Sequence, residues 1–332
     1  MSSSEQPRVA CVGGGYWGPN LIRNVHAQGA LAWLCDRHPG TLADLAERYP
    51  GIPSTPDFDE VLASDVDAVL LATPAATHHD LALRALEAGK HVFVEKPLAL
   101  TAAEARALAE TADRLDRVLM VGHILEYHPA FERLVELVRE GAIGEVRHLR
   151  SSRLSLGKLR QEENVLWSFA PHDLSLLQRI LGAARPERIR AFGTTVLQPG
   201  IPDTVHLDLA YAGGVTAHVH VSWLEPVKLH QLVVMGTEGM LVFEDSRPDD
   251  KLRLFDRGFR QEAGGWTLKR GEERVIPFEE GEPMAREIAH FLDCIRTRAR
   301  PRTDGWSGVR VLEVLEAAQQ ELDLPVPTGS PA

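Results

Sequence analysis

The stretch Val9-Ala10-Cys11-Val12-Gly13-Gly14-Gly15-Tyr16-Trp17-Gly18 decides the fold of this chain. A short apolar run predicts a buried strand, the glycines predict a tight turn, and the segment that ends near Gly29 has the pattern of a helix. In this order of elements, Gly13 permits the turn, Gly15 lets a pyrophosphate approach the backbone, and Gly18 lets the helix pack closely on the strand. The stretch therefore predicts a dinucleotide-binding loop, with the phosphates at the amino end of the helix.

An acidic residue stands where such a loop needs one. Residues 31–35 read as a second buried strand, and Asp36 closes it, 21 residues after Gly15. A spacing of about 20 residues suits a carboxylate that hydrogen-bonds the ribose hydroxyls, so NAD is favoured over NADP. Arg37 leaves a second interpretation open, because a guanidinium here can accept a 2′-phosphate or stack on adenine.

Composition limits the classes of protein that the chain can belong to. A length of 332 residues with 44% hydrophobic residues fits two domains, and a formal net charge of −11 argues against a nucleic-acid partner. Three cysteines without a metal-binding spacing predict neither disulfides nor a metal site. The amino end has no signal-peptide pattern, and no run reaches the ~18 apolar residues of a membrane span. We therefore expect a cytoplasmic protein with no membrane partner.

Two patterns of elements divide the chain into an expected dinucleotide-binding domain, residues 1–124, and a second domain, residues 125–332. The first pattern alternates strands and helices, which predicts an α/β domain with a doubly wound parallel sheet of the Rossmann type. The second pattern alternates apolar and polar residues within strands, which predicts an α+β domain with a large, mostly antiparallel sheet and one open face. Such an open face is often a subunit interface.

Individual elements follow from the same patterns. In the first domain we expect strands at 68–72, 91–94 and 118–121 and helices at 80–88 and 102–115, the latter with a capping box of Thr101 and Glu104. In the second domain we expect a helix at 129–140, strands at 146–150, 205–209, 215–221, 231–235, 240–243 and 252–255, and helices at 282–296 and 306–322. The strands 205–209 and 215–221 flank Ala212-Gly213-Gly214, which is typical of a hairpin.

Polar residues follow the predicted strands at the edge where a doubly wound sheet binds its ligands. Thr73-Pro74 and His78 follow one strand, Glu95-Lys96-Pro97 the next, and Gly122-His123 the one after it. The second domain offers the segment 167–173, which contains His172.

With the glycine-rich loop, these motifs resemble the Gfo/Idh/MocA family of nucleotide-dependent sugar and inositol oxidoreductases, and the likeness covers nearly the whole chain. Three segments further resemble the branch that oxidises the 3-hydroxyl of nucleotide-linked N-acetylated sugars, especially UDP-N-acetylglucosaminuronate. They are residues 14–18, residues 122–129 and residues 163–173.

The resemblance implies roles for two side chains. Lys96 would lie between the nicotinamide and the substrate hydroxyl, with Pro97 in a cis peptide and Glu95 as an acceptor for the cofactor ribose. A nearby positive charge and burial disfavour an ammonium, which suits Lys96 to proton exchange, although a strand-end lysine can also be simply solvated. His172, which we expect to open a helix, would remove the hydroxyl proton, since an imidazole titrates near neutral pH. Packed or solvated histidine is the alternative.

One position departs from the family pattern. Many members carry an aspartate four residues before this histidine, and here Ser168 occupies that position. A serine cannot supply a carboxylate's charge, so a proton relay through it is in doubt, and Asp173 replaces it only if its side chain faces inward.

The remaining candidates complete the expected sites. Lys158 and Arg160 either grip a carboxylate or diphosphate or lie in a solvated loop. Tyr16 and Trp17 are expected to cover the cofactor or to pack under it, with no chemistry of their own. The cofactor set is Gly13, Gly15, Tyr16, Trp17, Gly18, Asp36, Arg37, Thr73, Pro74, His78, Glu95, Lys96 and Pro97. The substrate set is His123, Tyr127, Lys158, Arg160, Asn164, Trp167, Ser168, His172 and Asp173.

Together these features predict an NAD(P)-dependent oxidoreductase that moves a hydride between a sugar secondary alcohol and nicotinamide. The substrate that the resemblance favours is a UDP-N-acetyl sugar or uronate, and the resemblance also implies a homodimer or homotetramer through the open sheet face. Two alternatives stay open: a free sugar or inositol dehydrogenase, and a nucleotide-binding sensor without catalysis.

Overall fold

The structure is a computed structural model that describes residues 6–157, 159–161 and 163–322. It divides into two compact units. Within the described residues, unit 1 contains 6–124 and 282–312, and unit 2 contains 125–281 and 313–322. No helix in this described part is both long and apolar enough to cross a membrane.

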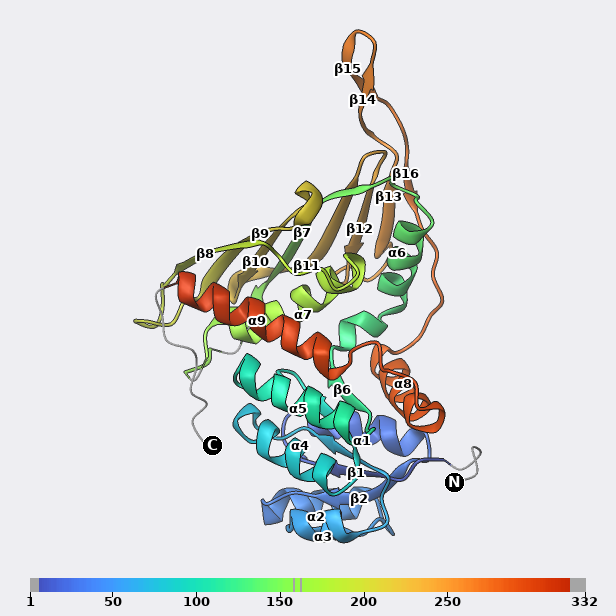
Figure 1. Cartoon of the computed structure of the whole chain (residues 1–332), viewed down its shortest axis with the longest axis vertical. Coiled ribbons are helices and arrows are strands. Elements are labelled where there is room, and N and C mark those ends of the chain that lie inside the picture. Colours follow the sequence, from blue (N-terminus) through green and yellow to red (C-terminus); the bar gives the residue numbers. More distant parts are fainter. Residues whose placement is uncertain (1–5, 158, 162, 323–332) are drawn as a thin grey trace. The chain divides into compact units, whose positions relative to one another are not determined.

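Unit 1 is built on a six-stranded parallel sheet in the order β3-β2-β1-β4-β5-β6 (Figure 1). This is the strand order of a Rossmann fold and confirms the predicted doubly wound sheet. Strands β1, β4 and β6 are buried along their whole length, as expected for a sheet covered on both faces. The strands are β1 (Val9–Val12), β2 (Leu31–Cys35), β3 (Ser54–Thr55), β4 (Ala68–Leu71), β5 (His91–Glu95) and β6 (Leu119–Gly122).

Helices α4, α5 and α8 of unit 1 begin and end close to the positions that the sequence predicts, and α1 ends near Gly29 as expected, whereas no bounds were predicted for α2 and α3. The capping box of α5 is present, with Glu104 N donating to Thr101 Oγ1 at 3.1 Å and the Glu104 carboxylate accepting from Thr101 N at 3.2 Å. The helices are α1 (Gly18–Ala27), α2 (Pro39–Arg48), α3 (Phe58–Ala63), α4 (His78–Glu87), α5 (Ala102–Arg114) and α8 (Pro283–Thr297), with a 3-10 turn η1 (Ala75–Thr77).

Helix α8 belongs to unit 1, whereas the sequence pattern placed all of 125–332 in the second domain. The Arg23 guanidinium of α1 pairs with Glu282 at the start of α8, and Phe291 of α8 meets Phe93 of β5 with ring centroids 5.7 Å apart. The connection after α8 also joins the sheet, since Thr303 Oγ1 donates to Val121 O at 2.7 Å. The first segment of unit 1 ends at Ile124, and the chain returns to unit 1 between 282 and 312.

Unit 2 is built on an eight-stranded sheet in the order β16-β13-β12-β11-β7-β10-β9-β8 (Figure 1). All neighbours are antiparallel except β7 and β10, which confirms a mostly antiparallel sheet and the predicted hairpin of β9 and β10. The strands are β7 (Val146–Leu156), β8 (Arg188–Thr194), β9 (Thr204–Ala210), β10 (Thr216–Ser222), β11 (Leu224–Gly236), β12 (Met240–Glu244), β13 (Leu252–Phe255) and β16 (Glu273–Val275). A separate hairpin pairs β14 (Gly258–Glu262) with β15 (Gly265–Lys269).

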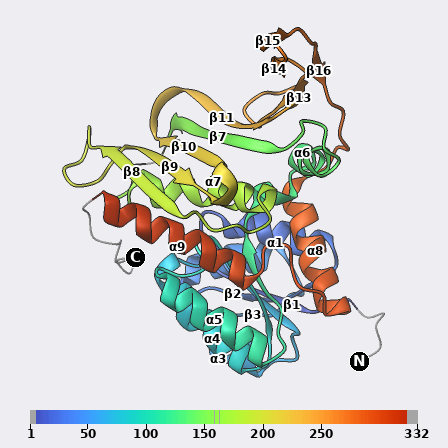
Figure 2. The same ribbon diagram turned by 45° about the horizontal axis from the view of Figure 1, so that its top comes forward.

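One face of this sheet is covered by helices (Figure 2). Along β7, Leu149, Ser151 and Arg153 are buried on the covered face. On β9 the alternate residues His206 and Asp208 are exposed on the other face. The remaining helices are α6 (Pro129–Arg139), α7 (Val165–Ile180) and α9 (Gly305–Glu321), with 3-10 turns η2 (Ile124–Tyr127) and η3 (Ala212–Gly214). The division between the two units falls within α9, after Leu312.

Candidate active site

The glycine-rich loop of unit 1 has a shape that side chains would destroy. Gly13 has φ +95°, and a Cβ there would lie 2.7 Å from the backbone of Ala72. A Cβ on Gly18 would lie 2.0 Å from the carbonyl oxygen of Gly13, whereas Gly15 faces open space. No side chain caps the amino end of α1, so an anion can approach the backbone there, although Pro19 has no N–H group and Asn20 N donates to Trp17 O at 3.1 Å. This cradle fits the diphosphate of a dinucleotide.

Asp36 ties the end of β2 to this loop. Its Oδ2 accepts a hydrogen bond from Gly14 N at 2.7 Å, and its Oδ1 accepts from His38 N at 2.8 Å. Asp36 lines a cavity of about 900 Å³ beside the loop. Of the residues that the sequence predicted to hold the cofactor, this cavity brings together Gly13, Gly15, Asp36, Arg37, Thr73 and Pro74.

His78 braces two turns at the carboxyl edge of the sheet. The imidazole is buried, with Nδ1 2.7 Å from Pro97 O and Nε2 2.8 Å from Thr73 O. It thus joins the turn after β4 to the turn after β5. Burial lowers the pKa of His78, and the two carbonyl contacts oppose this shift. Contact between its ring and the cofactor stays a prediction.

Glu95 forms the centre of a polar cluster at the end of β5. Its Oε1 accepts from Trp17 Nε1 at 2.8 Å, and its Oε2 accepts from Lys96 N at 3.2 Å. Burial raises the pKa of this carboxyl group to about 7, against the opposing effects of Lys96 and Trp17. Gly122 of β6 leaves room for the carboxylate, because a Cβ there would lie 3.0 Å from it.

Trp17 therefore links the glycine-rich loop to the end of β5, while the side chain of Tyr16 beside it is 97% exposed. The Lys96–Pro97 peptide is cis, as the family resemblance implied.

His123 lies beside Lys96 on the next strand end. Glu95 pairs with Gly122 across the parallel ladder, so Lys96 and His123 are the residues that follow these two paired strand ends. His123 is 2% exposed, and neither ring nitrogen has a hydrogen-bond partner among the described residues. Burial, and then the charge of Lys96, lower the pKa of His123 to about 3. His123 is therefore a neutral hydrogen-bonding group and not a proton acceptor at neutral pH.

In unit 2, His172 lies in the middle of α7, whereas the sequence pattern predicted that it opens a helix. The helix starts at Val165, because the side chain of Asn164 accepts from the N–H groups of Leu166 at 3.0 Å and Trp167 at 3.3 Å. Pro171 made an earlier start hard to predict, since proline usually marks the first turn of a helix.

Gln319 of α9 fixes two of the expected substrate residues. Its Oε1 accepts from Asn164 Nδ2 and from Trp167 Nε1, both at 2.9 Å. Both side chains are buried, so this structure gives them a packing role, and their contact with substrate stays a prediction.

Asp173 is buried, but its carboxylate is bound within the protein. Arg153 Nε donates to Asp173 Oδ2 at 2.9 Å, Arg153 Nη2 donates to Oδ1 at 3.2 Å, and Ser151 Oγ donates to Oδ1 at 2.6 Å. The ion pair is almost inaccessible, with side-chain exposures of 9% for Arg153 and 1% for Asp173. Asp173 therefore anchors α7 to β7 next to His172.

The other expected substrate residues are placed as follows. Tyr127 and Ser168 are buried in unit 2, and Arg160 Nε pairs with Glu163 at 3.1 Å in an exposed segment. Lys158 lies outside the described residues. Their contacts with substrate remain predictions.

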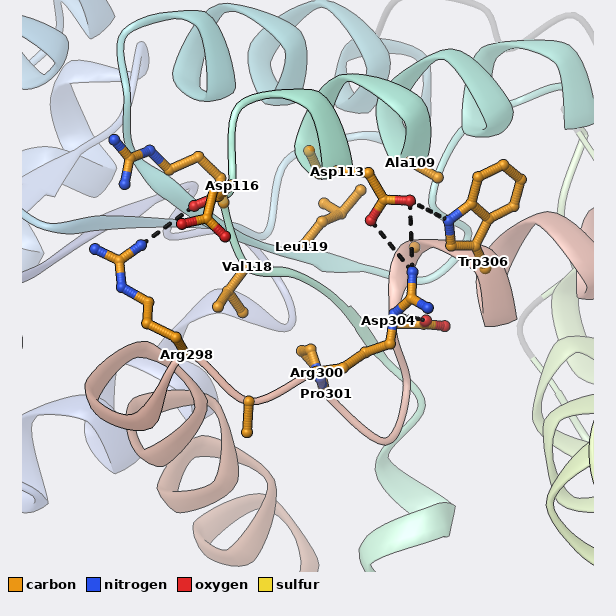
Figure 3. Close-up of a pocket in the computed structure, with 14 residues that line it drawn as sticks. Ala109, Asp113, Asp116, Val118, Leu119, Arg298, Arg300, Pro301, Asp304 and Trp306 are labelled. Atoms are coloured by element: carbon orange, nitrogen blue, oxygen red, sulfur yellow. Dashed lines mark hydrogen bonds and ion pairs between the residues drawn. The ribbon is translucent and has the colours of Figure 1, made fainter.

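A second cavity of unit 1, of about 160 Å³, lies at the opposite edge of the sheet (Figure 3). It is lined by Val118 and Leu119 at the amino end of β6. Its walls are cross-braced, since Arg300 contacts Asp113 at 3.2 Å and Asp304 at 2.8 Å. Arginines and aspartates are present in equal number among the residues that line this cavity. Their ion pairs hold the connection between α8 and α9 against α5.

Two family models match the chain. The oxidoreductase family with an NAD-binding Rossmann fold matches residues 7–123, and the GFO/IDH/MocA C-terminal domain matches residues 131–242. The chain therefore belongs to the Gfo/Idh/MocA family of oxidoreductases, which confirms the resemblance seen in its motifs. Its first domain is an NAD-binding Rossmann domain, which agrees with the cradle and with Asp36.

Individual relatives are similar over nearly the whole chain. UDP-N-acetylglucosamine 3-dehydrogenase of Acidithiobacillus ferrooxidans is 28% identical over 315 residues, covering 92% of this chain and 94% of the relative. Its solved structure superposes with a TM-score of 0.84 at 26% identity, covering 96% and 98% of the two chains. Inositol 2-dehydrogenase of Rhizobium meliloti is 26% identical, covering 92% and 94%. The structure of GenD2 from gentamicin A biosynthesis in complex with NAD has a TM-score of 0.80 at 26% identity, covering 97% and 96%.

Sequence reasoning missed the side chains that only the sheet of unit 2 brings together. Ser151 and Arg153 lie on the covered face of β7, and His230 of β11 pairs with Arg153 across the ladder. The alternation along β7 places Ser151 and Arg153 on the same face as Leu149. It could therefore have predicted that Arg153 is buried and needs a polar or acidic partner. The identity of that partner depends on strand pairing, which the local pattern does not contain.

Proposed function

We propose that this oxidoreductase oxidises a secondary alcohol of a sugar with NAD, at the 3-hydroxyl of a UDP-N-acetyl sugar or uronate. The observation that carries the proposal is the cluster at the carboxyl edge of the first sheet. There Glu95, Lys96 and His123 lie together, beside the glycine-rich cradle that Trp17 joins to β5.

The chain's own residues then divide the work. The loop from Gly13 to Gly18 and the Asp36 carboxylate hold the dinucleotide, and NAD, when bound, supplies the acceptor for the hydride. Lys96 donates a hydrogen bond to the substrate oxygen and stabilises the negative charge that develops there. The imidazole of His172 accepts the hydroxyl proton and passes it to solvent. One alcohol and NAD⁺ thus give one ketone, NADH and one proton.

The substrate class rests on the relatives and on the chain's own motifs. A relative named for a UDP-N-acetylglucosamine 3-dehydrogenase activity is similar over 92% of the chain. Arg160 provides an exposed guanidinium suited to a diphosphate or carboxylate. An inositol 2-dehydrogenase covers the chain equally well, so a free polyol is the second candidate substrate.

Variants at Lys96 and His172 test the proposed roles. Lys96→Met and His172→Asn should each lower kcat by about 10²- to 10⁴-fold, because each removes a group that holds or moves a proton in the reaction. NAD affinity, measured by calorimetry, should change little in His172→Asn. Steady-state kinetics with an accepted sugar gives kcat and KM separately.

Two controls sharpen this test. Lys96→Arg keeps the positive charge, but its bulkier planar guanidinium cannot place a single N–H group where the compact ammonium does, so it should remain impaired. His148→Asn changes a histidine on the other face of the unit 2 sheet and should leave kcat unchanged. Wild-type turnover in Lys96→Met or His172→Asn would remove that residue from the mechanism.

A further inference from the structure

His230 of β11 carries a buried N–H group whose direction the structure fixes. His230 lies opposite Arg153 of β7 in the antiparallel ladder, and Arg153 Nη1 is 3.3 Å from His230 Nδ1. A guanidinium can only donate hydrogen bonds, so Nδ1 must accept this one. A neutral ring that accepts at Nδ1 carries its hydrogen on Nε2.

This Nε2–H group is inaccessible to solvent and has no acceptor among the described residues. Burial and the positive charges of Arg153 and Lys228 lower the pKa of His230 to about 3, while Asp245 opposes them weakly, so the ring is neutral at physiological pH. Buried donors in folded proteins almost always have an acceptor, because leaving one without an acceptor costs its full desolvation. The donor therefore points to a ligand.

The same guanidinium connects His230 to the helix that carries His172. Arg153 holds Asp173 through two hydrogen bonds, and Asp173 follows His172 directly in α7. Arg153 therefore contacts both His230 on β11 and the turn of α7 that carries His172. Both lie on the covered face of the sheet in unit 2.

We propose that His230 binds the sugar substrate by donating its Nε2–H to an sp² oxygen of the sugar. The two sources of such an oxygen are the carbonyl of an N-acetyl group and the carboxylate of a uronate. This inference rests on the proposed function and adds to it a substrate-binding residue on β11. Arg153 is the positioning residue that selects the tautomer.

Calorimetric titration of UDP-sugars into the protein with bound NADH tests this inference without turnover. The matched ligands are UDP-N-acetylglucosamine, UDP-glucuronate and UDP-glucose, which carry an acetyl carbonyl, a carboxylate and neither group. His230→Phe should weaken binding of the ligand that supplies the oxygen by about 10- to 100-fold, the usual cost of losing one such hydrogen bond. Binding of UDP-glucose should be unchanged, and His230→Gln, which keeps an N–H donor, should recover part of the loss.

Thermal unfolding of the ligand-free protein separates binding from a structural role. His230→Phe removes a donor that has no protein acceptor, but it also removes the acceptor of Arg153 Nη1, so its Tm should fall modestly while its sugar affinity is lost. His230→Gln, whose amide oxygen can accept from Arg153, should keep a Tm nearer to that of the wild type. A lowered Tm together with wild-type sugar affinity would overturn the inference and make His230 a packing residue. Equal loss for all three ligands would also overturn it, since no particular oxygen would then be involved.

The same titration distinguishes this inference from the proposed function. If the wild-type protein binds no UDP-sugar and oxidises none, the proposed function fails and the inference fails with it. If the wild-type protein binds or oxidises a UDP-sugar and His230→Phe does so equally well, only the inference fails.

Discussion

At the residue scale, Gly13, Gly15 and Gly18 of the loop have different physical reasons to be glycine. The positive φ of Gly13 and the close approach of Gly18 to Gly13 O are requirements of the fold itself. Gly15 meets no atom within 4 Å of the position of a Cβ, and it lines the large cavity. We therefore propose that the bound dinucleotide, and not the fold, requires glycine at this position.

Alanine substitutions should therefore separate folding from binding. Gly15→Ala should leave Tm unchanged and weaken NAD binding at least ~10-fold, because its methyl group enters the space of the diphosphate. Gly18→Ala should lower stability by about 1 to 3 kcal/mol and weaken NAD binding as well, because the new methyl group collides with backbone. Denaturant unfolding and NAD calorimetry give the two quantities. Gly264→Ala is the control, because the added Cβ would meet no atom within 4 Å. Equal effects of Gly15→Ala and Gly18→Ala on Tm would contradict this distinction.

At the element scale, the elements whose reasons are local were predicted well. The strand at 68–71, the capping box of α5 and the hairpin of β9 and β10 follow from patterns within a few residues. The place of α8 has a reason that is distant in sequence, because it packs on unit 1 through Phe93 of β5 and is tied at its start to Arg23 of α1. The amino end of α7 has a local reason, the Asn164 cap, but the proline inside the helix pointed to a later start.

The candidate site divides in the same way. Gly13, Asp36 and the Glu95-Lys96-Pro97 turn could be predicted because a single strand end carries each of them. The link between Trp17 and Glu95 and the network of Arg153, Asp173 and His230 could not be predicted. They depend on which strands and helices become neighbours.

The Arg153–Asp173 pair should be a strong determinant of how α7 is held. Removing one partner leaves a buried charge, so Arg153→Met or Asp173→Leu should each lower the free energy of unfolding by about 3 to 5 kcal/mol. The double variant Arg153→Met/Asp173→Leu should lose less than the sum, because it leaves no unpaired charge. Urea unfolding of the wild type, the two single variants and the double variant gives the coupling free energy between Arg153 and Asp173. Additive losses of stability would show that the pair does not act as a unit.

At the scale of the whole molecule, buried neutral histidines make stability depend on pH. Burial lowers the pKa of His91 from 6.5 to about 4, and the pKa values of His123 and His230 to about 3. The unfolded chain takes up these protons near pH 6.5, whereas the folded protein resists protonation until lower pH. Stability is therefore full above pH 6.5 and is lost progressively as the pH falls toward these folded pKa values.

Acid unfolding tests this linkage. The depression at His91 alone corresponds to at most roughly 3 kcal/mol between pH 6.5 and 4. His91→Asn keeps an acceptor for Val118 N, whose N–H donates to His91 Nδ1 at 2.9 Å, and should flatten the pH dependence in this window. His218→Asn, at an exposed position, should not flatten it. An identical slope in His91→Asn and wild type would contradict the assignment.

The central claim is that this member of the Gfo/Idh/MocA family oxidises a nucleotide-linked sugar with NAD. The most direct measurement follows the absorbance of reduced nicotinamide after mixing the protein and NAD with UDP-N-acetylglucosamine or its uronate, beside free sugars and inositols. We predict that reduction occurs with a UDP-N-acetyl sugar and not with the free polyols. Reduction only with a free sugar or inositol, or none with any of these compounds while NAD binds tightly, would contradict the account.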